Sequence, residues 1–173
     1  MAYGRHEPAA TEQPRVKIWV DADSCPGVIK DILFRAAERT QVALVLVANR
    51  MLRVPPSPWI RAIQVPAGFD VADQRIADEA NVGDLVVTSD IPLAAKVVAK
   101  QAHVIDFRGE LLDANNIEER LTLRNFMDGL RASGVDTGGP AALSAADSKA
   151  FANRLDRLLT KLKPQRHAKT DDS

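Results

Sequence analysis

The sequence predicts an α/β fold, a single domain built on a parallel, doubly wound sheet flanked by helices. Short apolar runs rich in Val, Ile and Leu alternate with segments whose apolar residues repeat at helical spacing. The runs are almost continuously apolar, which is typical of strands buried on both faces of a parallel sheet. The length of 173 residues suits one domain with a sizeable core and is too short for two ordinary ones.

Five apolar runs are expected to form the strands. Each is short and is bounded by polar or turn-forming residues. In chain order they are Lys17–Val20, Ala43–Ala48, Ala62–Val65, Leu85–Thr88 and His103–Ile105. If the first strand is central, with the second and third on one side and the fourth and fifth on the other, the strand order reverses between the first and the fourth.

Helices are expected to connect most of these strands. The first begins near Pro26, a residue suited to the first turn, with Asp23 or Ser24 as its cap. Two more are expected at Asp70–Ala80 and Ile91–Ala99. The second and third strands are separated only by residues 49–60, a loop with three prolines, so this connection is the least defined.

Two amphipathic helices, Ile117–Leu130 and Ala145–Leu162, are expected after the last strand. Ser144 and Asp147 match a loose capping box before the second of them, with Asp in place of Glu or Gln. Residues 1–14 and 164–173 lack apolar periodicity and are expected to be mobile tails, which leaves residues 15–163 as the domain.

The composition excludes several classes of protein. The 23 basic and 23 acidic residues balance, so contact with nucleic acid would need a local basic patch. Cys25 is the only cysteine, which excludes an intramolecular disulfide and fits a reducing compartment. The longest apolar stretches are of strand length, and residues 1–14 hold no signal-peptide centre. We expect a soluble, cytoplasmic protein without a membrane segment.

Carboxylates follow two of the predicted strands directly. Asp21 and Asp23 end the first run, and Asp90 ends the fourth. In open α/β sheets, ligands bind outside the carboxyl ends of the strands, and Asp21 and Asp90 become neighbours in the strand order given above. Asp23 could instead cap the first helix and Asp90 the third. Thr88 and Ser89 are expected to turn the chain and orient Asp90.

Further acids lie at the start of the second helix and after the fifth strand. Asp70 and Asp73 could simply complement the helix dipole, with Asp70 as the cap. Of the two, Asp73 is the better ligand candidate. For Asp106 a turn role and a ligand role are equally supported, and Cys25 is interpreted as a buried small residue because no histidine base is evident near it.

Such a set of aspartates is suited to a divalent cation. Mg²⁺ and Mn²⁺ prefer oxygen ligands and are commonly held by a few carboxylates together with waters and substrate phosphates. Without a cation, clustered carboxylates would repel one another and raise each other's pKa. A hydrolytic metal site uses the ion to activate water and to neutralise charge at phosphorus.

Five blocks of the sequence follow one another in a specific order. They are Trp19–Pro26, Thr88–Ala94, Asp106–Gly109, Thr137–Pro140 and Phe151–Asn153. Together they resemble the YaiI/YqxD family of uncharacterised bacterial proteins, from the first strand to the final helix. That family looks like a branch of the PIN-like superfamily, whose members are typically metal-dependent ribonucleases. The resemblance implies Asp21, Asp73 and Asp90 as the metal-binding acidic core, with Asp23 close by in the catalytic set.

Three functions are therefore open. The favoured one is a Mg²⁺- or Mn²⁺-dependent phosphodiesterase, a ribonuclease acting on single-stranded RNA. The Asp-x-Asp after an apolar strand also resembles haloacid-dehalogenase-type phosphatases, in which Asp21 would be the nucleophile and Asp23 a general acid. Cys25 departs from that pattern, and no downstream acid motif follows. The third possibility is a non-catalytic module that binds RNA or protein.

Overall fold

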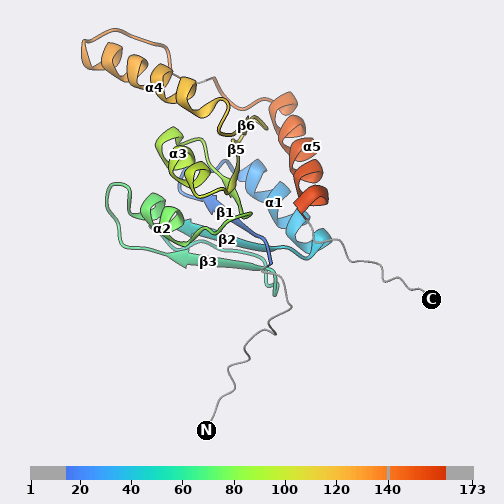
Figure 1. The fold of residues 1–173 in the computed structure, drawn as a ribbon. Coiled ribbons are helices and arrows are strands. Elements are labelled where there is room, and N and C mark those ends of the chain that lie inside the picture. The colour runs from blue at the N-terminus through green and yellow to red at the C-terminus, as the bar shows by residue number, and fades with distance from the viewer. Residues whose placement is uncertain (1–14, 140, 163–173) are drawn as a thin grey trace, which may run out of the picture.

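A six-stranded sheet with helices on both faces organises the chain (Figure 1). The computed structural model describes residues 15–139 and 141–162, so the two predicted tails lie outside the described residues. The strands are β1 (Lys17–Asp21), β2 (Ala43–Ala48), β3 (Ile60–Gln64), β4 (Leu85–Val87), β5 (His103–Ile105) and β6 (Leu111–Leu112). The helices are α1 (Gly27–Thr40), α2 (Val71–Glu79), α3 (Ile91–Ala99), α4 (Ile117–Ala132) and α5 (Ala145–Leu162).

The strand order is β3-β2-β1-β4-β5-β6, which confirms the predicted central position of β1 and the reversal between β1 and β4. The first five strands are parallel, and β6 pairs antiparallel with β5. The sequence did not predict β6, because two leucines give no periodic pattern. The sheet is therefore mixed at this edge rather than wholly parallel.

Two apolar cores lie on opposite faces of the sheet. Residues of β1 alternate between them, with Ile18 and Val20 facing one core and Trp19 the other. The first core is covered by α1 and α5, and the second by α2, α3 and the start of α4. This layering positions the amino ends of α2 and α3 beside the carboxyl ends of β1 and β4.

The connection between β2 and β3 contains no helix. Leu52, Val54 and Trp59 from this loop pack against the core beneath α1, so loop side chains cover the sheet where a helix would otherwise lie. β3 begins at Ile60 and is an edge strand, with Arg61 and Ala62 exposed. The expectation that every strand is buried on both faces is thus wrong for β3, because consecutive residues of a strand point to opposite faces and both Arg61 and Ala62 are exposed.

Buried Asp84, which lies directly before β4, connects this strand to β1. Its Oδ1 accepts a hydrogen bond from the Lys17 N–H at 3.0 Å, and its Oδ2 accepts one from Trp19 Nε1 at 3.0 Å. The backbone N–H of Asn81 also donates to Oδ2, at 2.9 Å. These donors satisfy the buried carboxylate at the amino ends of the two strands.

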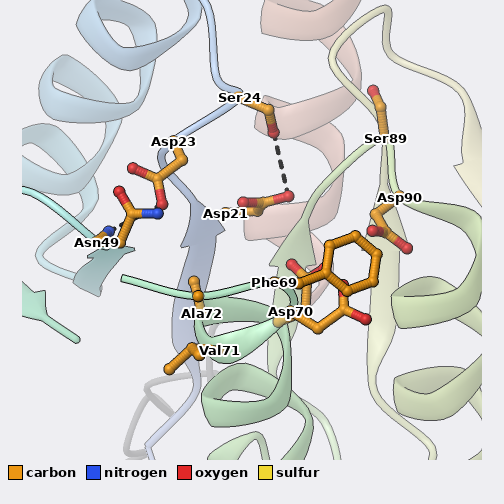
Figure 2. A pocket seen from close by; sticks show the side chains of 12 residues that line it. Asp21, Asp23, Ser24, Asn49, Phe69, Asp70, Val71, Ala72, Ser89 and Asp90 are labelled. Carbon is orange, nitrogen blue, oxygen red and sulfur yellow. Dashed lines mark hydrogen bonds between the residues drawn. The ribbon is translucent and has the colours of Figure 1, made fainter. Parts of the chain in front are cut away.

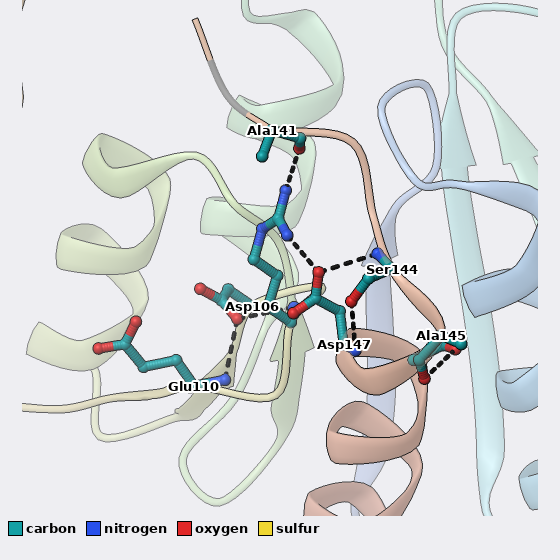
Figure 3. Close-up of polar contacts among 8 residues, drawn as sticks. Asp106, Glu110, Ala141, Ser144, Ala145 and Asp147 are labelled. Carbon is teal, nitrogen blue, oxygen red and sulfur yellow. Dashed lines mark hydrogen bonds and ion pairs between the residues drawn. The ribbon is translucent and has the colours of Figure 1, made fainter.

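The turn after β5 joins the sheet to α5 (Figure 3). Asp106 Oδ1 accepts hydrogen bonds from the N–H groups of Arg108 and Glu110, both at 2.9 Å, which confirms a turn role. Gly109 has φ +90°, and a Cβ there would lie 2.8 Å from the backbone of Ala150. Arg108 donates to the Asp147 carboxylate and to the Ala141 carbonyl. The turn therefore holds α5 in place.

The predicted capping box at the start of α5 is confirmed. The Asp147 N–H donates to Ser144 Oγ at 3.0 Å, and the Ser144 N–H donates to Asp147 Oδ2 at 2.9 Å. Within residues 15–139 and 141–162, no helix combines the length and the apolar character needed to cross a membrane.

Candidate metal centre

A pocket of about 490 Å³ opens at the carboxyl edge of the sheet, beside the reversal between β1 and β4 (Figure 2). It is rich in acidic side chains. Its lining consists of Asp21, Asp23, Ser24, Asn49, Gly68, Phe69, Asp70, Val71, Ala72, Asp73, Ser89 and Asp90. All four aspartates that the sequence singled out for chemistry thus border the same space.

Three carboxylates form the closest group. One oxygen each from Asp70, Asp73 and Asp90 lies within 4.8 Å of the others. Two oxygens bound to one Mg²⁺ at 2.0–2.1 Å are at most about 4.2 Å apart, so small side-chain rotations would bring this group into coordination range. Asp73 and Asp90 are half-buried and Asp70 is exposed, which leaves one side accessible to solvent and substrate.

Asp90 has two structural roles. Its Oδ1 accepts a hydrogen bond from the Leu93 N–H at 2.9 Å, so the predicted cap of α3 is confirmed. Its own N–H donates to Thr88 Oγ1 at 3.0 Å, which also confirms that Thr88 orients this residue. Capping uses one carboxylate oxygen of Asp90 and fixes the direction of the side chain.

Asp70 departs from its predicted role as a helix cap. It directly precedes α2 but its side chain makes no capping hydrogen bond, and its backbone is left-handed, with φ +63°. Aspartate adopts this conformation more readily than most residues. The unusual backbone brings the Asp70 carboxylate into the group with Asp73 and Asp90. Sequence reasoning favours Asp73 over this residue as a ligand, because an acid before a helix is ordinarily a cap.

Asp73 lies in the first turn of α2, where several negative charges meet. Its pKa is raised to about 7, first by burial and then by a side-chain hydrogen bond with Asp90 and the charges of Asp21, Asp90 and Asp70. The shift is a consequence of crowding like charges in a partly dry space. A divalent cation would reverse it by favouring the ionised carboxylates.

Asp21 is the most buried acid of the pocket, with 7 % of its surface exposed. Its Oδ2 accepts hydrogen bonds from Ser24 Oγ and Thr88 Oγ1, each at 3.1 Å. Burial raises the pKa of Asp21, and the charges of Asp90 and Asp23 raise it further, while the two hydroxyl donors lower it. Asp21 is therefore electrostatically joined to the three-carboxylate group although it stands outside it.

Asp23 points toward the end of β2. Its Oδ2 accepts a hydrogen bond from the Asn49 N–H at 2.8 Å, and its Oδ1 lies 3.6 Å from Arg50 Nε. The N-cap of α1 is Pro26, which has no side-chain capping bond, so the prediction that Asp23 or Ser24 caps this helix is wrong. Both side chains instead bind neighbours at the pocket.

Cys25 is buried, and burial raises the pKa of its thiol to about 12. A thiol in this state is a poor nucleophile at neutral pH, as expected for a small buried residue.

The comparisons with known proteins agree with the family resemblance. The model of a family described as "Uncharacterized BCR, YaiI/YqxD family" matches residues 19–161. A UPF0178 protein of Thioalkalivibrio sulfidiphilus is 64 % identical over 146 residues, which are 84 % of this chain and 99 % of the relative. A UPF0178 protein of Bordetella avium is 67 % identical over 144 residues, 83 % of this chain and 94 % of the relative.

No solved structure matches the chain. The family match spans the acidic pocket, the turn that holds α5 and, apart from Ile18, the buried residues of both cores. From these matches we conclude that the chain belongs to the YaiI/YqxD (UPF0178) family.

Proposed function

We propose that this protein is a Mg²⁺- or Mn²⁺-dependent phosphodiesterase of the PIN-like type, a cytoplasmic ribonuclease that acts on single-stranded RNA. The observation that carries the proposal is the group of Asp70, Asp73 and Asp90 oxygens within 4.8 Å of one another. The group lies at a topological switch point, where open α/β sheets bind their ligands. Asp21, from the adjacent central strand, lines the same pocket.

The donor set fits a hard divalent cation. All the candidate ligands are carboxylate oxygens, with no thiol or imidazole among the pocket residues. Asp73 and Asp90 would hold the ion together with Asp70, and Asp21 would complete the set from β1. When bound, the ion would supply charge neutralisation at a phosphate and activation of a water molecule.

The protein's own residues orient this set. Thr88 binds the Asp21 carboxylate and the Asp90 backbone at once, so it fixes the acid that ends β1 and the acid that caps α3. Ser24 binds Asp21 from the loop before α1. We assign Asp23 a place at the pocket edge in the catalytic set, where it is held by Asn49 and can contact substrate.

The phosphatase alternative has less support from the geometry. A nucleophilic Asp21 would need a free oxygen facing the substrate phosphorus. Both hydroxyl hydrogen bonds go to Oδ2, so only Oδ1 could attack, and it belongs to a side chain of a residue with 7 % of its surface exposed. The arrangement suits a carboxylate that helps to hold a metal ion better than it suits a nucleophile.

Calorimetric titration with Mn²⁺ tests the proposal. Asp73→Asn and Asp90→Asn should each weaken binding, whereas Asp78→Asn should not. Asp78 is a matched control because it is an exposed acid on α2, the helix of Asp73, where it accepts a hydrogen bond from Gln74. Cleavage of an end-labelled single-stranded RNA is then measured with and without Mn²⁺.

The outcomes separate the candidate functions. Metal-dependent cleavage that both substitutions abolish supports the ribonuclease. Mn²⁺ binding without cleavage of RNA identifies a non-catalytic module, and the absence of Mn²⁺ binding overturns the metal centre itself.

A further inference from the structure

An exposed aromatic ring stands at the acidic pocket. Phe69 has 92 % of its surface exposed, yet it lines the pocket together with Asp73 and Asp90. Figure 2 shows its ring on the same side of the pocket as the Asp70 and Asp90 side chains. A phenylalanine in this position gives up the favourable burial that such side chains normally obtain, and it does so beside carboxylates.

The backbone around Phe69 turns sharply. Gly68 has φ +152° and Asp70 has φ +63°, so the residues directly before and after Phe69 in the chain both have positive φ. A Cβ at Gly68 would lie 2.9 Å from Val71 Cγ2, which restricts this position to glycine. The turn presents Phe69 to solvent while the next residue enters the carboxylate group. The position of the Phe69 ring therefore depends on the start of α2, the helix that also carries Asp73.

We propose that Phe69 is a substrate-positioning residue on which a nucleobase stacks when the neighbouring phosphodiester enters the carboxylate site. The inference rests on the proposed function and names the feature of the substrate that this pocket recognises. An aromatic face binds any base by stacking, whereas the faces of bases inside a duplex are already covered. Phe69 therefore selects unpaired nucleotides without selecting sequence.

Stacking is measured with a single-stranded RNA 12-mer that carries one 2-aminopurine, whose fluorescence falls when the base stacks. Binding is followed in Ca²⁺ so that it is recorded separately from cleavage in Mn²⁺. We expect Phe69→Ala to bind about 5- to 150-fold more weakly and to lose the quenching, the range that removal of one stacking contact gives. Phe69→Trp should retain both properties.

Two controls separate stacking from other effects. Phe126→Ala removes an exposed aromatic residue from α4, outside the pocket, and should bind like the wild type. Phe69→Leu keeps an apolar side chain but removes the π-face, and should behave like Phe69→Ala. A second 12-mer lacks the bases at the position of the 2-aminopurine and at its two neighbours. The wild type and Phe69→Ala should bind this RNA equally, because it offers no base for Phe69 to stack on.

Each result decides one of the two ideas. If the wild type cleaves RNA but Phe69→Ala binds and quenches as the wild type does, the Phe69 assignment is overturned while the ribonuclease stands. Equal binding by Phe69→Leu and the wild type also overturns it, because an apolar contact would then suffice. Quenching that depends on Phe69 without any cleavage supports the assignment and overturns the ribonuclease. If the wild type binds no RNA, the assignment fails.

Discussion

The hydroxyl of Thr88 donates a hydrogen bond to Asp21 Oδ2 across 3.1 Å, and both residues are buried. Asp21 ends β1 and Thr88 follows β4, so the bond spans the two strands at which the sheet order reverses. The same hydroxyl accepts a hydrogen bond from the Asp90 N–H. The neutral side chain of Thr88 thus sets the relative positions of Asp21 and Asp90, which are far apart in the sequence.

Thr88→Val should destabilise the protein by about 1–3 kcal/mol, because the isosteric change leaves a buried carboxylate oxygen and a backbone N–H without this partner. Urea unfolding without metal measures the loss. Thr122→Val is the matched control, since Thr122 Oγ1 donates to the Glu118 carbonyl on an exposed face of α4. It should change stability by no more than about 0.5 kcal/mol. Equal effects of the two substitutions would contradict the role of Thr88.

The metal-free protein should lose stability as the pH rises from about 4 to about 7. The pKa of Asp73 is raised from 3.8 to about 7 in the native state, so the folded protein holds a proton that the unfolded chain has released in this window. Asp73→Asn carries no such proton and should lack this part of the pH dependence. Thermal unfolding in a chelator, compared with Asp78→Asn, measures the difference. Parallel curves for Asp73→Asn and the wild type would show that the site does not raise this pKa.

Asp21→Asn should weaken Mn²⁺ binding while the metal-free variant melts no lower than the wild type. The substitution removes a ligand charge, and it also relieves burial of that charge and its repulsion with Asp90 and Asp23. Calorimetry and thermal unfolding measure the two effects. Unchanged Mn²⁺ affinity, or a large loss of metal-free stability, would make Asp21 a structural residue.

No covalent phosphate should form on Asp21 during incubation with a phosphomonoester. The buried Asp21 carboxylate is held by two hydroxyl groups, whereas a metal-activated water would attack a phosphodiester directly. Crystals grown with beryllium fluoride provide the measurement. Density for beryllium fluoride bonded through beryllium to an Asp21 oxygen, together with turnover of the monoester and none of RNA, would establish the phosphatase.

Gly109→Ala should destabilise the fold by about 2–5 kcal/mol, since it combines an unfavourable positive φ with a backbone clash. The added Cβ would lie 2.8 Å from Ala150 and 2.9 Å from the Phe151 nitrogen. Gly129→Ala is the control, because this glycine lies within α4 and a Cβ there meets nothing within 4 Å. That change should stabilise the helix by up to about 1 kcal/mol. Chemical denaturation distinguishes the two.

Periodicity and strand-end chemistry predicted the framework of the molecule correctly. β2, β5, α3 and α5 have the bounds expected from the apolar pattern, because packing reinforces local preference there. The edge strand β3 begins earlier than expected, and β6 was missed, because exposed or two-residue strands leave little pattern. The left-handed backbone of Asp70 could not be read from the sequence either, since it depends on the turn that Gly68 permits.

Asp84 and Thr88 immediately precede and follow β4, and each binds β1. A slip of one residue between these strands would break both connections and turn every β1 side chain to the opposite face. Asp21 and Thr88 are separated by 67 positions in the chain, yet their alignment is secured at both ends of a three-residue strand. The spacing of the pocket carboxylates thus depends partly on Asp84, an acid at the amino ends of β1 and β4 that does not line the pocket.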